Sequence, residues 1–254
     1  MVVTTRTVDV SHTAVKPMRM LVTEPKGDAH HPGIVLYSDI FQITGPQQRM
    51  SARLAGYGFV VATPEIWHRL EEPGTAIPFD DAGRTRGLDN AKKTTVAETD
   101  ADCRAALDWL AAHPRTTPGA LGAMGFCIGG HLAFRAALQS EVRASACFYP
   151  TGVHDGRLGS DDDAGTLQRV GEIRGDLRLV YGTNDPHVPP PARAAIDDAL
   201  RAAGTRFETM AYEAEHAFMR DEGPRWDPEA ADLAWSTGIA FLRKHLGVRS
   251  PSPP

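Results

Sequence analysis

Cysteine is scarce in this sequence and does not occur in a paired pattern. Only three are present in 254 residues, at positions 103, 127 and 147. An odd count does not indicate the disulfide framework of an exported protein. In a reducing cytoplasm, a cysteine is more often a packed apolar side chain or a nucleophile than half of a disulfide. We therefore predict a cytoplasmic protein with free thiols.

Long apolar runs and an excess of positive charge are also missing. No run approaches the roughly 20 residues of a membrane span, and the N-terminal segment lacks the apolar core of a signal peptide. Lys and Arg number 27 against 32 Asp and Glu, a net charge of 27 − 32 = −5. Because nucleic-acid binders need a basic surface, we expect neither a nucleic-acid nor a membrane partner.

Short apolar runs alternate with amphipathic stretches along the chain. The predicted strands cover residues 6–10, 18–23, 33–38, 59–64, 120–126, 144–149, 177–182 and 206–212. The predicted helices cover residues 46–57, 94–112, 128–138, 190–203 and 227–246. The first two strands are expected to pair antiparallel. Strands that alternate with helices favour an α/β fold with a mostly parallel central sheet and helices on both faces.

No linker or internal repeat divides the chain, and α/β folds often use about 250 residues as one unit. We therefore predict a single domain over residues 1–246, followed by a Pro- and Ser-rich tail, 247–254, that is expected to be disordered. Residues 65–93 mix proline, glycine and charge without a clear period. Such a stretch is expected to be irregular, and either functional or mobile.

One of the three cysteines lies where a buried strand is predicted to turn into a helix. Residues 125–130 read Gly-Phe-Cys-Ile-Gly-Gly, the G-x-S-x-G pattern of a nucleophile elbow with Cys127 in place of serine. The helix beginning at Ile128 aims its positive end at this thiol, which favours the thiolate, and its first N–H is a candidate oxyanion donor. The alternative is a small buried cysteine in a turn. Cys103 and Cys147 lie inside predicted elements and are expected to be core residues.

A nucleophile of this kind needs a base and an acid that orients it. In the α/β-hydrolase order the acid follows the nucleophile and the histidine comes last. Asp185 follows the strand over 177–182, and His216 follows the strand over 206–212. All three candidates therefore lie at carboxyl ends of parallel strands, where open α/β sheets place their sites. Asp185 could instead form a turn or cap a helix, and His187 is the chief rival for the base.

With these residues in place, the sequence resembles the dienelactone hydrolase family of α/β-hydrolases, which is carboxymethylenebutenolidase-like, over roughly residues 18–245. The segments that carry the likeness are 37–41, 62–65, 73–76, 125–130, 184–189 and 212–218. The resemblance implies an α/β-hydrolase fold and a carboxylic ester or lactone hydrolase that opens an enol-lactone ring. It also implies that no metal or organic cofactor takes part.

The resemblance assigns roles to particular residues. Cys127 would attack the carbonyl, and the N–H groups of Ile128 and Ile40 would form the oxyanion hole. His216, held by Asp185, would promote hydrolysis of the acyl-enzyme. Backbone donors at the developing oxyanion can supply on the order of 3 kcal/mol each.

The family also has a carboxylate after its first core strand, usually Glu, which helps to take the thiol proton. Here that position is Asp39, which is one methylene shorter and could instead brace its loop. Family arginines bind a substrate carboxylate. Arg220 matches one of them, and either Arg84 or Arg86 matches the other. The planar guanidinium pairs bidentately with a carboxylate, although each of these arginines could equally be a solvated surface charge.

Two aromatic residues complete the candidate pocket. Phe41 belongs to the segment after the first core strand and is a candidate substrate contact. Trp67 lies in a region that lines the pocket in the family, and it could form a pocket wall or belong to the core. The segment from residue 65 to 93 departs from the family pattern, so the substrate pocket could differ from that of a true dienelactone hydrolase.

Two other function classes remain open at this stage. The same fold could serve a cyclase, isomerase or acyl-transfer enzyme, because fold does not fix function; a non-catalytic binding protein is the other. A metal centre is not expected, since His30 and His31 would point to opposite faces of an extended chain and no metal-ligand spacing occurs. The expected partner is a small molecule, which could carry a carboxylate, and the expected assembly is a monomer or homodimer.

Overall fold

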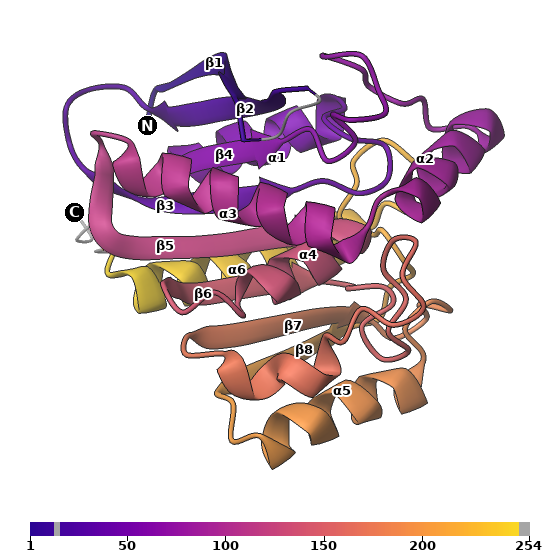
Figure 1. The fold of residues 1–254 in the computed structure, drawn as a ribbon. Coiled ribbons are helices and arrows are strands. Elements are labelled where there is room, and N and C mark those ends of the chain that lie inside the picture. The colour runs from indigo at the N-terminus through magenta and orange to yellow at the C-terminus, as the bar shows by residue number, and fades with distance from the viewer. Residues whose placement is uncertain (13–15, 249–254) are drawn as a thin grey trace.

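An eight-stranded sheet forms the centre of the structure (Figure 1), with strand order β1-β2-β4-β3-β5-β6-β7-β8. The structure is a computed structural model that describes residues 1–12 and 16–248. The predicted tail beyond residue 248 lies outside the described residues. The pairs β1–β2 and β2–β4 are antiparallel, and every other neighbouring pair is parallel. The expected antiparallel start and mostly parallel sheet are therefore confirmed.

The strands follow the apolar runs of the sequence. They are β1 (Val3–Val10), β2 (Met18–Pro25), β3 (His31–Tyr37), β4 (Val60–Pro64), β5 (Thr116–Phe126), β6 (Val142–Phe148), β7 (Asp176–Gly182) and β8 (Phe207–Tyr212). The middle strands β3, β4 and β7 are buried over almost their whole length. Both faces of these strands are apolar because both faces are covered, which is typical of parallel sheets.

Helices cover the sheet on both sides, as predicted. They are α1 (Gly45–Gly56), α2 (Asp81–Lys93), α3 (Val96–Ala112), α4 (Ile128–Ala136), α5 (Pro190–Ala202) and α6 (Pro228–Leu246), with a short 3₁₀ helix η1 (Leu167–Glu172). In Figure 1, α3, α4 and α5 lie on the near face and α6 lies behind the sheet. Successive strand residues serve opposite cores: Val35 packs with α3 and α4, whereas Ile34 and Leu36 pack with α1 and α6.

The prediction of an irregular stretch over residues 65–93 is wrong in its second half, because α2 occupies Asp81–Lys93. The Asp80 side chain caps this helix by accepting a hydrogen bond from the Gly83 N–H at 2.7 Å. Two internal glycines, Gly83 and Gly87, weaken helix propensity and hide the helical period. Packing against the rest of the fold therefore stabilises α2, because the helix propensity of its own sequence is low.

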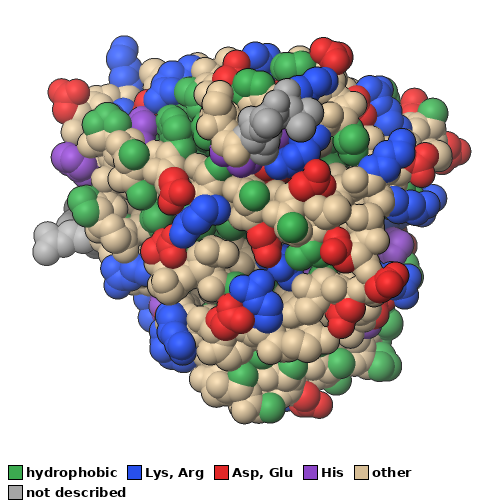
Figure 2. Space-filling view, in the orientation of Figure 1, with side chains coloured by type: hydrophobic (Ala, Val, Ile, Leu, Met, Phe, Trp, Pro, Cys, Tyr) green, Lys and Arg blue, Asp and Glu red, His purple; other side chains and the backbone are tan. Residues whose placement is uncertain are grey.

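The molecular surface carries both signs of charge. Figure 2 shows acidic and basic side chains interspersed over one face, without a large area of a single sign. Over residues 1–12 and 16–248, no helix combines the length and the apolar character that crossing a membrane requires. The net charge of −5 is thus not concentrated on the face that Figure 2 displays.

Candidate active site

Cys127 lies at a sharp turn between β5 and α4. Its backbone has φ 58° and ψ −122°, a conformation that residues other than glycine rarely adopt. A Cβ atom added to Gly125 would lie 1.9 Å from the Gly129 carbonyl oxygen, so only glycine fits there. This is the geometry of a nucleophile elbow, and it leaves the Cys127 side chain partly exposed at the floor of a cavity.

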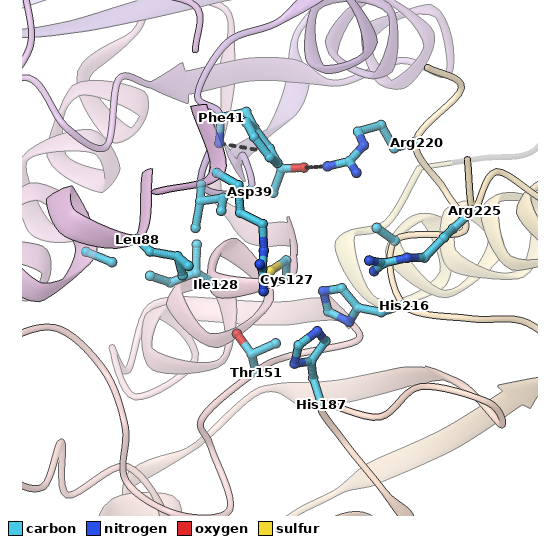
Figure 3. Close-up of a pocket in the computed structure, with 14 residues that line it drawn as sticks. Asp39, Phe41, Leu88, Cys127, Ile128, Thr151, His187, His216, Arg220 and Arg225 are labelled. Carbon is cyan, nitrogen blue, oxygen red and sulfur yellow. Dashed lines mark hydrogen bonds and ion pairs between the residues drawn. The ribbon is translucent and has the colours of Figure 1, made fainter. Parts of the chain in front are cut away.

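His216 and Asp185 form a hydrogen-bonded pair beside this cysteine. The Nδ1 atom of His216 lies 2.7 Å from Oδ2 of Asp185, and both side chains are buried. The other oxygen of Asp185 accepts a hydrogen bond from the His187 backbone N–H at 2.8 Å. Figure 3 shows the ring of His216 next to Cys127. The structure thus brings together the three residues that the chain order predicted.

The charges of this group are mutually dependent. Burial alone would lower the pKa of His216, but the charge of Cys127 and the hydrogen bond with Asp185 outweigh it and raise the pKa of His216 to about 9. Burial would raise the pKa of Asp185, but the hydrogen bond from His216 holds that pKa below its ordinary value. At neutral pH, His216 is therefore protonated.

Two residues in the cavity lining have a backbone N–H without an acceptor among the described residues. No hydrogen bond within the described residues uses the N–H of Ile40 or of Ile128, and both residues line the cavity with Cys127. Ile128 is the first residue of α4, where N–H groups have no partner in the helix. The two residues predicted to form an oxyanion hole thus have free donors in the expected region.

The segment that carries Ile40 is held by two contacts. The indole Nε1 of Trp67 donates to the Ile40 carbonyl oxygen at 3.0 Å. On another side, helix α2 lies so close that a Cβ on Gly87 would be 2.6 Å from the same oxygen. Trp67 is buried and does not line the cavity. Of the two alternatives for Trp67, the structure places it in the core, where it positions the loop of Ile40.

Asp39 forms an ion pair with Arg220 rather than pointing at the thiol. Oδ2 of Asp39 lies 2.9 Å from a guanidinium nitrogen of Arg220, and Oδ1 accepts from the Phe41 N–H at 3.0 Å. Burial raises the pKa of Asp39 although Arg220 opposes the shift. The guanidinium of Arg220 also lies over the rings of Phe41 and Phe79, at 5.0 and 4.5 Å from the centroids. Asp39 therefore braces the loop and holds Arg220.

These residues surround a cavity of about 240 Å³. Its lining consists of Asp39, Ile40, Phe41, Arg84, Leu88, Ala91, Cys127, Ile128, Thr151, His187, His216, Ala217, Arg220 and Arg225. Figure 3 shows most of these side chains arranged around Cys127. Ligand pockets commonly enclose about 300–1,000 Å³, so a cavity below that range suits only a small molecule.

The two loop arginines have different places. Arg84 lines the cavity. Arg86 is absent from the lining and instead pairs with Glu71, through its Nε at 2.8 Å and a second, shorter contact. Because the carboxylate of Glu71 pairs with the guanidinium of Arg86, we do not retain Arg86 as a substrate contact.

Six lining residues were not among the predicted site residues, namely Leu88, Ala91, Thr151, His187, Ala217 and Arg225. His187 was considered only as a rival base, and it packs edge-on against the His216 ring with centroids 4.6 Å apart. Arg225 and Thr151 carried no signal, because neither belongs to a motif and their loops are brought to the cavity only by the fold. The proximity of His187 to Asp185 in sequence was the one usable clue.

The remaining cysteines are buried in the core, as predicted. Burial raises the pKa of Cys103 to about 11 and raises that of Cys147 further. Neither thiol is therefore ionised near neutral pH, and Cys127 is the one cysteine that reaches the cavity.

One group within the described residues has the spacing of metal ligands, namely His12, His68 and Asp102, whose ligand atoms lie within 4.8 Å of one another. Asp102 accepts from Arg69 at 2.6 and 2.7 Å and contacts His12 at 2.6 Å. Arg69 already neutralises the carboxylate, so a metal ion would have to displace it. The Nδ1 atom of His68 has no partner, whereas a ligating histidine usually donates from its second nitrogen. The cluster is best explained as an ion-pair network that ties the segment after β1 to α3.

The sheet, its helices and the turn at Cys127 together define an α/β-hydrolase. A crystal structure from Klebsiella pneumoniae, described as a "Putative Dienelactone Hydrolase", superposes with a TM-score of 0.84, covering 96% of this chain and 100% of the other. The two sequences share 23% identity. At this identity the likeness shows the fold alone.

Sequence comparison gives the family. The model of the dienelactone hydrolase family matches residues 18–246. A Saccharomyces cerevisiae protein named "Putative carboxymethylenebutenolidase" is 36% identical over 95% of this chain and 91% of its own length. A carboxymethylenebutenolidase of Pseudomonas sp. is 27% identical over 84% of each chain. The chain therefore belongs to the dienelactone hydrolase family, and the corresponding class of activity is hydrolysis of an ester or a lactone.

Proposed function

We propose that this protein hydrolyses a carboxylate-bearing ester or lactone through an acyl-enzyme on Cys127. The observation that carries the proposal is the meeting, in one cavity, of an elbow cysteine with the hydrogen-bonded pair His216–Asp185. Nucleophile, base and orienting acid within reach of one another are the signature of covalent catalysis. The cavity size favours a small substrate.

The first half of the reaction forms a thioester. The Cys127 sulfur attacks the carbonyl carbon, and the N–H groups of Ile40 and Ile128 stabilise the oxyanion. When the intermediate collapses, the ester C–O bond breaks and His216 donates its proton to the leaving oxygen. For a lactone, that oxygen stays attached and the ring opens.

The second half consumes water. Neutral His216, oriented by Asp185 at 2.7 Å, takes a proton from a water molecule that attacks the thioester carbonyl. The C–S bond breaks, the carboxylic acid product leaves with His216 protonated again, and the proton taken up by Asp39 returns to the Cys127 sulfur. Asp185 stays ionised throughout, because its hydrogen bond with His216 keeps its pKa low.

Arg220 and Asp39 link substrate binding to the thiol. A substrate carboxylate at Arg220 competes with Asp39 for the guanidinium, which now lies 2.9 Å from Asp39. Asp39 released from this ion pair loses the partner that opposes the upward shift of its pKa, and it becomes a better acceptor for a proton from Cys127. Arg84, which also lines the cavity, is the second cation available to the substrate.

The free thiols of Cys103, Cys127 and Cys147 support a working place in the reducing cytoplasm. We further propose that residues 1–246 act as one domain. The single sheet that contains the eight strands supports this. We also propose that the protein works as a monomer or homodimer and binds no nucleic acid.

Substitution of the proposed nucleophile tests the function. Cys127→Ala and His216→Ala should abolish turnover of an activated ester while circular dichroism and thermal unfolding show an intact fold. Cys147→Ala, which removes a buried thiol on β6, is the matched control and should retain activity. Full activity of Cys127→Ala would contradict the proposal.

The mass of the product separates hydrolysis from the alternative reactions. Hydrolysis of a lactone adds one water to the substrate, whereas a cyclase or isomerase leaves its mass unchanged. Turnover without a mass change would replace the proposed reaction by a rearrangement on the same fold.

A further inference from the structure

Three arginines line the cavity of Cys127, in a protein whose net charge is −5. They are Arg84, Arg220 and Arg225, and the one carboxylate in the lining is Asp39. Three positive charges against one negative charge leave a surplus of two within the lining. The pair behind the cavity does not change this balance, because the positive charge of a protonated His216 offsets the negative charge of Asp185.

The arginines occupy two separate positions. Arg220 is held by Asp39 at 2.9 Å and lies over the ring of Phe41. Arg84 and Arg225 instead both act on His187, whose pKa is lowered mainly by burial, then by the charge of His216, and to a smaller extent by these two arginines. Figure 3 shows Arg225 reaching toward the side of the cavity where His216 and His187 lie, whereas Arg220 lies against Asp39. The cavity thus offers one cationic position at Asp39 and a second near His187.

The second position is available to a ligand. Within the described residues, the Arg84 guanidinium makes no hydrogen bond or ion pair. Arg225 has one ion pair, with Glu215 at 3.7 Å, and those two side chains are 43% and 60% exposed. An exposed pair at that separation is weak and readily exchanged for a better partner. Both side chains can therefore turn their donors to an anion in the cavity.

We propose that the cavity selects a substrate with two anionic groups, one carboxylate at Arg220 and a second carboxylate between Arg84 and Arg225. The substrate class is then a small ester or lactone that keeps two free carboxylates, such as a monoester of a tricarboxylic acid, with the reacting carbonyl at Cys127. This inference rests on the proposed function, which requires only the first carboxylate. It makes Arg225 a specificity-determining residue.

A series of esters with a common leaving group tests the selection. The 4-nitrophenyl monoesters of acetic, succinic and tricarballylic acid carry no, one and two negative charges. The wild-type chain should show a kcat/KM about tenfold higher for the dianion than for the monoanion, because hydrogen bonds to charged groups are strong. Arg225→Gln and Arg84→Gln should each lower this ratio severalfold, and Arg225→Lys should keep part of it.

Arg201→Gln is the matched control, because Arg201 lies on α5 outside the cavity lining and its side chain is 61% exposed. This variant should keep the wild-type ratio. A wild-type ratio near one, or an equal loss of kcat/KM for all three esters in Arg225→Gln, would overturn the inference. Failure of the wild-type chain to cleave any of the three would count against the proposed function instead.

A binding measurement removes the dependence on turnover. Glutarate and butyrate differ in one carboxylate and contain no reactive carbonyl ester. In Cys127→Ala, calorimetry should show glutarate binding about tenfold more tightly than butyrate, and Arg225→Gln in that background should abolish the difference. Equal affinities for the two acids would overturn the inference even if the esters are hydrolysed.

Discussion

His216 is the residue on which the charge state of the site depends. Its ring lies between the carboxylate of Asp185 and the thiol of Cys127, and these partners raise the pKa of His216 to about 9 in spite of burial. In the proposed mechanism, a protonated His216 is the general acid for the leaving oxygen. The account therefore requires the acid to be present at neutral pH and to be lost only in alkaline solution.

The pH profile of kcat/KM should show this loss. Because the pKa of His216 is raised, the protonated form persists below about pH 9, and kcat/KM should fall as the pH rises through that value. Asp185→Asn removes a hydrogen bond that raises this pKa, so the alkaline limb should move to lower pH and kcat should fall by about 10²-fold or more.

Asp197→Asn, on helix α5 outside the cavity lining, is the control and should leave the limb in place. The pH dependence is measured with an ester that has no ionisable group. An alkaline limb that is the same in Asp185→Asn and in the wild-type chain would argue against His216 as the acid.

Single residues were predictable from sequence where a motif fixed them. The G-x-C-x-G turn and the chain order of acid and histidine pointed to Cys127, Asp185 and His216, which the fold brings together. Arg225 could not be found in this way. It follows the histidine by nine positions in a loop without a pattern, and only the path of that loop over the cavity makes it a lining residue.

Among the elements, α2 shows where sequence reasoning reached its limit. Gly83 and Gly87 lower its helix propensity, yet Gly87 is what allows α2 to lie against the Ile40 carbonyl. The long helices and buried strands were predictable, because their apolar periods are unbroken. Helix α2, which contacts the loop of Ile40, was not predictable. The glycines that allow its close packing also lower its helix propensity.

Gly87→Ala should reduce catalysis more than stability. The new Cβ would lie 2.6 Å from the Ile40 carbonyl oxygen, so either α2 or the loop must shift. Such crowding costs about 1–3 kcal/mol, and a displaced Ile40 N–H should lower kcat about tenfold or more. Steady-state kinetics and urea unfolding measure the two effects.

Gly56→Ala provides the matched control. Gly56 ends helix α1, and nothing lies within 4 Å of a Cβ built there. This variant should keep wild-type kcat and should be as stable as the wild-type chain or up to about 1 kcal/mol more stable. A Gly87→Ala variant with wild-type kcat would show that α2 does not position Ile40.

At the scale of the whole molecule, the net charge is negative, whereas the charged residues that line the cavity are mostly positive. The chain carries −5 overall, whereas three arginines and one aspartate line the cavity. The overall field repels an anionic substrate and the cavity attracts it. Sequence composition revealed only the repulsion, because the clustering of arginines from helix α2 and from the loop before α6 is a product of the fold.

Salt dependence shows which field dominates. At about 0.1 M salt, charges are screened beyond about 10 Å. If the cavity arginines govern association, kcat/KM for a carboxylate-bearing ester should fall severalfold between about 0.05 and 0.5 M NaCl. A neutral ester with the same leaving group should change little. A rise in kcat/KM for the anionic ester would mean that the net negative charge dominates.

The most direct measurement of the central claim is the site of the acyl group. In His216→Ala, the step that hydrolyses the thioester is slowed, so an activated ester should leave its acyl group on the protein. Mass spectrometry of the digested chain should then place one acyl group on the peptide that contains Cys127, and Cys127→Ala should carry none. Acylation of any other residue, or an unmodified Cys127 in a folded chain that still turns over the ester, would contradict the account.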